Sequence, residues 1–205
     1  MEANYQAAWV PDDDSARSWP DALALAVDWI AGRCQEEDAS AVLITNAFGS
    51  PAYPDVLARI GPYEHITPRS SPASNGEGPV LAFVPTPKAM DLAIRLARNS
   101  SLAVVESRSL YPLRGWARGV GAVNLVDPGG AMAPLDATLA TAVESLRMCG
   151  NNGYTDTYGK RDAKRILGDL KQQGLLDIDD LVGAVAAVGI RHESAERLRK
   201  LANSA

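Results

Sequence analysis

Between residues 79 and 126, short apolar segments alternate with helical patterns, and this alternation limits the fold more than any other feature. Apolar runs at 79–84, 101–106 and 122–126 predict strands, and the intervening segments 87–98 and 113–119 predict helices. Each predicted strand is apolar throughout, which is typical of strands that are buried on both faces of a parallel sheet. The sequence therefore predicts an α/β fold in which helices cover both faces of a mostly parallel sheet.

The same alternation extends toward the N-terminus. Ser18, followed by Pro20 and Asp21, is typical of a helix start, and the apolar spacing after it predicts a helix over about 19–35. A strand is predicted over 41–46, then a short helix over 54–60 and a strand over 64–67. We therefore expect a Rossmann-like α/β domain over residues 18–131, preceded by a flexible or loosely packed lead-in over residues 1–17.

The chain after residue 131 has helical patterns only. Helices are predicted from Pro134 onward and over 157–173, 177–188 and 193–203. Gly174 and Gly189 stand where the ends of helices favour a residue with positive φ. Residues 132–205 are therefore predicted to form an all-helical C-terminal subdomain.

Composition narrows the classes of protein. The net charge is -5, and residues 1–150 carry 11 basic and 17 acidic side chains. This balance disfavours nucleic acid as a partner, although it leaves the possibility open, because a nucleic-acid surface is basic. We find no secretory signal pattern and no apolar stretch of the ~20 residues that a membrane span needs. We therefore expect a cytoplasmic protein without a membrane partner.

The sequence lacks the motifs that would identify a cofactor. The first predicted strand-to-helix loop lacks the Gly-x-Gly-x-x-Gly pattern of dinucleotide sites, and the chain has no Gly-x-x-x-x-Gly-Lys-Ser/Thr loop. With two cysteines and two histidines, we expect no metal site. The cofactor is therefore unknown, and the sequence does not decide whether the protein is an enzyme.

Polar side chains at the ends of three predicted strands are the candidate ligand site. Ligands of parallel sheets bind beyond the carboxyl ends of the strands. Asn46 follows the first of these strands, and Thr86 and Lys88 follow the second at a helix start that suits an anion. Glu106 and Arg108 follow the third, where the guanidinium can bind a phosphate or carboxylate. We predict these five residues as the binding site.

For Thr86, Lys88 and Glu106 there is also a structural interpretation, which we favour. Thr86 with Pro87 is an ordinary helix start, with Lys88 in solvent. Glu106 is as well explained by an ion pair with Arg108 or Arg114, or by exposure to water.

The C-terminal helices suggest a different function. The spacing around Gly189 resembles a helix-turn-helix, but Glu193 and Glu196 in its second helix are unfavourable for contact with DNA, and a plain helical hairpin is the better interpretation. Basic side chains nevertheless gather in one predicted helix, at Lys160, Arg161, Lys164 and Arg165.

Two functions follow as hypotheses. The first is an α/β protein that binds an anionic small molecule or a nucleotide, with the reaction, if any, unknown. The alternative is a non-catalytic regulatory or interaction protein whose helical C-terminal segment binds a protein partner or DNA. A structural subunit of a larger assembly is also compatible with the sequence.

Overall fold

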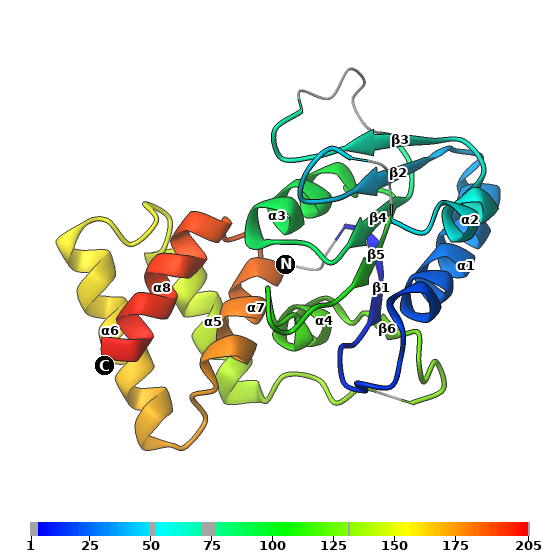
Figure 1. Cartoon of the computed structure of the whole chain (residues 1–205). Helices are drawn as coiled ribbons and strands as arrows, with labels where there is room; N and C mark the ends of the chain where they lie inside the picture. The colour runs from blue at the N-terminus through cyan, green and yellow to red at the C-terminus, as the bar shows by residue number, and fades with distance from the viewer. Residues whose placement is uncertain (1–3, 50–51, 71–76, 131, 205) are drawn as a thin grey trace. The chain divides into compact units, whose positions relative to one another are not determined.

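A six-stranded, entirely parallel sheet organises the first part of the chain (Figure 1). The computed structural model describes residues 4–49, 52–70, 77–130 and 132–204. The strands are β1 (Gln6–Val10), β2 (Ala41–Ile44), β3 (Tyr63–Ile66), β4 (Val80–Phe83), β5 (Ser101–Val105) and β6 (Val123–Asn124), and their order across the sheet is β3-β2-β4-β5-β1-β6. The parallel sheet predicted from the apolar strands is confirmed.

Helices cover both faces of this sheet, as Figure 1 shows. One face carries α1 (Trp19–Glu37), α2 (Pro54–Leu57) and the single 3₁₀ turn η1 (Ala58–Ile60), and α3 (Pro87–Leu96) lies on the other. Ser18 caps α1 by accepting a hydrogen bond from the Asp21 amide at 3.3 Å. The predicted helix start at Ser18 is therefore confirmed.

The expected lead-in contains a strand. Within residues 1–17, the segment Gln6–Val10 forms β1, which pairs along its whole length with β5 and also pairs with β6. Residues 1–3 lie outside the described part. The sequence does not predict this strand, because β1 is short and alanine-rich and its apolar signal is weak. Ala8 and Val10 are nevertheless almost fully buried.

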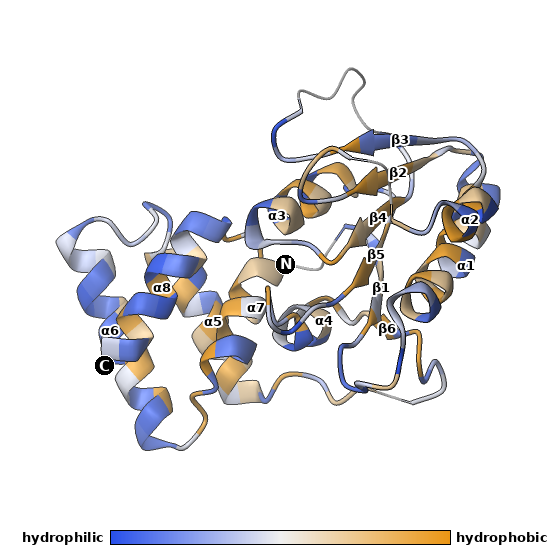
Figure 2. Ribbon diagram, in the orientation of Figure 1, coloured by the Kyte–Doolittle hydropathy of each residue, from blue (hydrophilic) through white to orange (hydrophobic). Residues whose placement is uncertain are grey.

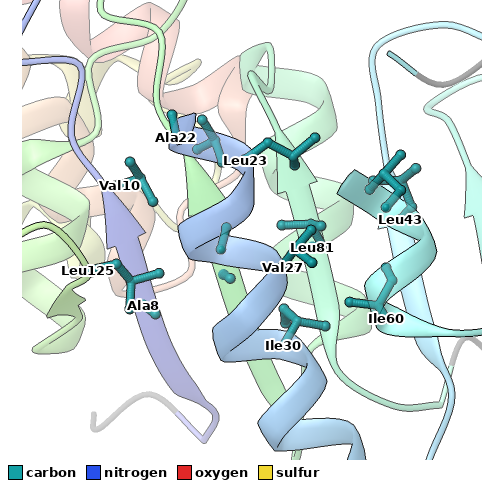
Figure 3. Close-up of a cluster of buried hydrophobic side chains, with 14 of the residues drawn as sticks. Ala8, Val10, Ala22, Leu23, Val27, Ile30, Leu43, Ile60, Leu81 and Leu125 are labelled. Carbon is teal, nitrogen blue, oxygen red and sulfur yellow. The ribbon is translucent and has the colours of Figure 1, made fainter. Parts of the chain in front are cut away.

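The main core lies between the sheet and α1 (Figure 3). The helix turns Leu23, Val27 and Ile30 toward the strands, and each of these side chains is at most 1% exposed. A fully buried Leu, Val or Ile side chain contributes about 1.5–3 kcal/mol. Figure 2 shows the same pattern in the inner strands β2, β4 and β5, which are apolar, whereas the edge strand β3 is largely polar. Burial on both faces explains why the inner strands β2 and β4 are apolar throughout.

The remaining helices form a second compact unit. They are α4 (Arg114–Val120), α5 (Ala137–Cys149), α6 (Thr157–Gln172), α7 (Ile178–Ala187) and α8 (His192–Ser204). By contacts, residues 112–121 join residues 132–204 in this helical unit, whereas residues 4–111 and 122–130 make up the sheet unit. The helical C-terminal segment is confirmed, and α4 belongs to it although α4 lies between β5 and β6 in sequence.

Inside the helical unit, α4 and α7 pack at very short range. A Cβ atom on Gly115 would lie 1.9 Å from the Asp180 backbone oxygen, and one on Gly183 would lie 2.6 Å from the Trp116 nitrogen. Trp116 is fully buried. The contact therefore requires glycine on both helices.

Ion pairs also link α4 to α7. The buried Asp180 carboxylate accepts from Arg114 Nε at 2.8 Å and from one guanidinium nitrogen of Arg118 at 3.2 Å. Arg114 also bonds the α7 N-cap residue, Asp177, at 3.1 Å. These arginines therefore belong to the packing of α4 on α7.

Candidate functional site

The strand connections diverge between the neighbours β2 and β4, which places a switch point there. The chain leaves β2 through α2 toward β3, whereas it leaves β4 through α3 toward β5, in the opposite direction. Ligands of open parallel sheets bind in the crevice that such a reversal leaves beyond the strand ends. We call the side of the sheet at which all strands end the carboxyl edge.

At this edge, hydrogen bonds join the β2 and β4 loops. The Asn46 side chain donates to the Val84 carbonyl at 2.8 Å and accepts from the Thr86 amide at 2.7 Å. The Val84 amide in turn donates to the Val105 carbonyl at 2.9 Å, so β5 continues the row. Asn46 therefore fixes the loop that leads into α3.

A second set of bonds joins the β5 and β1 loops. The Glu106 amide donates to the Val10 carbonyl at 3.0 Å, and the Glu106 carboxylate accepts from the Asp12 amide at 3.2 Å. The Asp12 carboxylate accepts from the Arg108 amide at 2.9 Å. Four neighbouring strands thus end in loops that are bonded to one another.

The predicted residues in the β4–α3 loop have distinct roles. Thr86 caps α3 through its hydroxyl, which accepts from the Ala89 amide at 3.4 Å. Because Pro87 has no N–H and Ala89 is bonded to Thr86, the Lys88 amide is the donor that remains in the first turn. The Lys88 side chain is exposed, and within the described part of the chain it has no hydrogen bond or ion pair. Lys88 is therefore available to a ligand.

The two predicted residues after β5 differ in exposure. Glu106 is 3% exposed, so the interpretation of a solvated carboxylate is wrong. The Arg108 side chain is exposed and makes no hydrogen bond or ion pair with any residue that the structure describes. Arg114, the other partner considered for Glu106, bonds Asp180 and Asp177 in the helical unit. Arg108 is thus a second cation at the edge.

Val84 has an unusual backbone conformation at this edge. Its φ is 48°, in the left-handed region, which is rare for a β-branched residue and costs about 1–3 kcal/mol. The strain is held by both of its backbone bonds, the N–H to Val105 and the carbonyl to Asn46. Residues held in strained conformations cluster at functional sites.

Asp12 lies at the carboxyl edge, although the sequence does not predict it as a site residue. Asp12, Asp13 and Asp14 follow β1 after a single proline. Because the sequence does not predict β1, it does not place these carboxylates at the end of a strand. Arg17 offsets part of their charge, because it bonds the Asp13 carboxylate at 3.0 Å and the Pro11 carbonyl at 2.7 Å. Three consecutive aspartates just after a strand are the sequence signal that would identify Asp12 as a site residue.

Charge is divided along the carboxyl edge. The β1 and β5 ends carry the Asp12 and Glu106 carboxylates, whereas the cations Lys88 and Arg108 follow β4 and β5. An anion is repelled by the first group and attracted by the second. The first turn of α3 is therefore the favoured place for an anion, and the carboxylates suit hydroxyl or amino groups.

The outer strands carry a histidine that remains neutral. His65 Nε2 lies 2.7 Å from Thr45 Oγ1, and Thr45 donates its own proton to the Ala47 carbonyl at 2.9 Å. Nε2 is therefore the donor toward Thr45. Partial burial lowers the pKa of His65, so the ring adds no positive charge near pH 7.

The four basic residues predicted on α6 lie on its exposed surface. Arg161 lies 3.6 Å from Asp162 and stacks over Tyr158, and Arg165 lies 3.8 Å from Asp169. Lys160 and Lys164 have no hydrogen bond or ion pair with the described residues. Beside them, α5 and α6 border an open groove of about 480 Å³ that includes Thr141, Ser145 and Arg165.

Two basic residues of α8 form hydrogen bonds or ion pairs within the helical unit. Arg197 donates to the Gly153 carbonyl at 3.1 Å, and Arg199 bonds the Asp179 carboxylate. Gly189, in the turn before α8, has a φ of 89°. The glycine turn predicted between the last two helices is confirmed, while the bonded arginines favour a helical hairpin over a DNA-reading helix.

The described residues contain neither a candidate metal site nor a candidate membrane-spanning helix. No group of three or more His, Cys, Asp or Glu side chains there is arranged to hold a metal ion. None of the helices in that part combines the length and the apolar character that crossing a membrane requires.

The fold and the carboxyl edge define an α/β protein with an all-parallel sheet, a switch point between β2 and β4, and a helical unit. Comparison of the chain with protein-family models, curated proteins and solved structures found no match.

Proposed function

We propose that the protein binds a small anionic ligand of the nucleotide type at the carboxyl edge of its sheet. The observation that carries this proposal is the convergence of four strand-end loops, joined by the bonds of Asn46, Glu106 and Asp12, at the switch point of a parallel sheet.

The anionic group is expected at the start of α3. The Lys88 amide and ammonium group and the positive end of the helix dipole attract an anion there. The guanidinium of Arg108, on the neighbouring loop, supplies the bidentate contact that suits a phosphate. Thr86 and Asn46 position this loop rather than contact the ligand through a free group.

The carboxylates fit the uncharged part of such a ligand. Asp12 accepts one bond from the Arg108 amide through Oδ2, so its other oxygen can accept from a sugar hydroxyl. Glu106 is buried and holds the Asp12 backbone in place. In this arrangement the phosphate and the hydroxyl groups lie over different strand ends.

The test is calorimetric titration with inorganic phosphate, ribose 5-phosphate and nucleoside monophosphates. Replacing both Lys88 and Arg108 by Gln should weaken binding of the phosphorylated ligands about 100-fold or more, since hydrogen bonds to charged groups contribute ~1.5–3 kcal/mol each. The matched control replaces Arg95, in the last turn of α3, and Arg98, just after it, by Gln; both side chains are exposed. Equal binding by both double variants, or no binding by the native protein, would refute the proposal.

A second candidate function belongs to α6. Lys160 and Lys164 lie one helical turn apart and are unpartnered within the described chain, beside the open α5–α6 groove. A protein partner with an acidic surface, or DNA, fits this set of charges. Loss of such binding when both lysines are replaced by Glu, with ligand binding at the sheet retained, would be its signature.

A further inference from the structure

Three aromatic side chains meet at the carboxyl edge on the face of the sheet that carries α1 and α2. Phe83 is in the centre, with its ring centroid 6.3 Å from that of Trp19 and 6.1 Å from that of Tyr53. Both pairs are nearly perpendicular, with interplanar angles of 85° and 86°. We call Trp19, Tyr53 and Phe83 the aromatic cluster.

Each member comes from a different carboxyl-edge connection. Trp19 is the first residue of α1, Tyr53 is the N-cap residue of α2, and Phe83 is the last residue of β4. Tyr53 is held in the left-handed region, at φ 60°, an uncommon conformation for an aromatic residue. The loops that form the proposed anion site therefore also supply the aromatic cluster.

The cluster is only half in the core. Tyr53 and Phe83 are partly buried and pack against the hydrophobic core beneath α1, whereas Trp19 is 40% exposed. A perpendicular contact engages at most one face of each ring, so Phe83 leaves at least one face of the Trp19 indole unused. The partly exposed indole is held by Phe83, which in turn packs against Tyr53, so Trp19 offers a supported surface on which a flat ring can stack.

The cluster is continuous with the anion site. Phe83 begins the loop that ends at Lys88, and five residues span at most about 18 Å. Because α3 lies on the opposite face of the sheet from α1, a ligand that reaches both lies across the carboxyl edge. Its phosphate then lies at the start of α3 and its other end on the aromatic cluster.

We infer that the ligand carries a flat heteroaromatic ring that stacks on Trp19, so that the site takes nucleoside phosphates in preference to sugar phosphates. The inference rests on the anion-binding function proposed above and adds the class of ligand. Stacking of a base on an aromatic side chain is sequence-tolerant, because every base has a π face. The cluster therefore selects for a base without selecting which base.

The experiment compares adenosine monophosphate, ribose 5-phosphate and adenosine by calorimetry on the whole protein. The native protein should bind adenosine monophosphate at least about 10-fold more tightly than ribose 5-phosphate, as expected for one stacked base. Trp19→Leu should abolish that difference and leave ribose 5-phosphate binding unchanged. Trp19→Phe should keep most of it, and the matched control Phe48→Leu, which removes another exposed ring from the edge, should keep all of it.

The outcomes separate the two proposals. Equal binding of the two phosphates by the native protein overturns the stacking inference and leaves the anion site standing. Adenosine binding that requires Trp19, without binding of either phosphate, supports the stacking surface and overturns the anion site. If Trp19→Leu loses its native circular dichroism spectrum, Tyr53→Leu replaces it, and an undiminished preference in that variant counts against the cluster.

Discussion

At the scale of single residues, Tyr154 illustrates a polar group that the fold fully buries. Its side chain is 0% exposed, and its hydroxyl donates to the Leu146 carbonyl at 2.8 Å, at the end of α5. The Leu146 carbonyl also accepts from the Gly150 amide at 2.8 Å. Removal of the hydroxyl therefore leaves no backbone group without a partner.

Tyr154→Phe should lower the free energy of unfolding at pH 7 by about 0.5–1.5 kcal/mol, the net contribution of one hydrogen bond. Burial raises the pKa of Tyr154 above its ordinary value near 10, so the folded state keeps a proton that the unfolded state releases. The stability of the native protein should then fall as pH rises through 10 and beyond, more steeply than that of the variant. Urea unfolding of both proteins between pH 7 and 11 measures this, and parallel curves would contradict it.

At the same scale, the candidate site was only partly visible in the sequence. Thr86 and Lys88 were recognised because a Thr-Pro helix start has a local chemical signature that needs no tertiary information. The role of Asn46, which bonds a loop some 40 residues further along the chain, depends on β2 and β4 being neighbours. The same dependence on long-range pairing hid Asp12.

At the scale of elements, the close approach of α4 and α7 depends on glycine. Gly115→Ala would place a methyl group against the Asp180 backbone, and since neither helix backbone can rotate away locally, the helices must separate. We expect a loss of about 1–3 kcal/mol in the free energy of unfolding, the usual cost of overpacking. Gly183→Ala, which meets the Trp116 amide nitrogen, should behave in the same way.

Gly168→Ala is the matched control for this prediction. Gly168 lies inside α6, and no atom lies within 4 Å of the position that an alanine methyl group would occupy, so alanine gains helix propensity without a clash. It should stabilise the protein by up to ~1 kcal/mol. Chemical unfolding should show a lower free energy of unfolding for Gly115→Ala and Gly183→Ala and a higher one for Gly168→Ala. A Gly115→Ala protein as stable as the native one would show that the contact is loose.

Most elements could be predicted because their signals are local. The helices at 157–173 and 177–188 are observed as α6 and α7, within one residue at each end, and their ends are set by Asp caps and helix-ending residues. β1 could not be predicted in the same way, since its stability comes from pairing with β5 and β6 rather than from its own composition. Strands that depend on neighbours carry weak signals of their own.

At the scale of the whole molecule, the chain passes between its two units more than once. It leaves the sheet unit after residue 111 to form α4, returns at residue 122 for β6, and leaves again after residue 131. The boundary expected from the sequence, between residues 131 and 132, therefore cuts α4 away from α7. Sequence order alone could not reveal this, because α4 follows the strand–helix alternation of the sheet.

A fragment of residues 1–131 should consequently fail to bury α4. Trp116 is fully buried in the whole protein, and the backbone of α7 packs directly on its amide. Without α7 we expect a red-shifted tryptophan emission, binding of a hydrophobic dye and a tendency to associate. Replacing Trp116 by Phe in the fragment should remove most of the emission shift, which separates exposure of α4 from general unfolding.

Adding residues 132–205 as a separate chain tests the cause directly. Because the contact of α4 with α7 requires no peptide bond at residue 131, the two fragments together should recover the native emission and lose the dye signal. The fragment pair carrying Gly115→Ala should recover less, since the methyl group obstructs the same contact. A fragment of residues 1–131 that is monomeric, binds no dye and unfolds cooperatively would show instead that α4 is stable without α7, and that the chain divides where its sequence suggests.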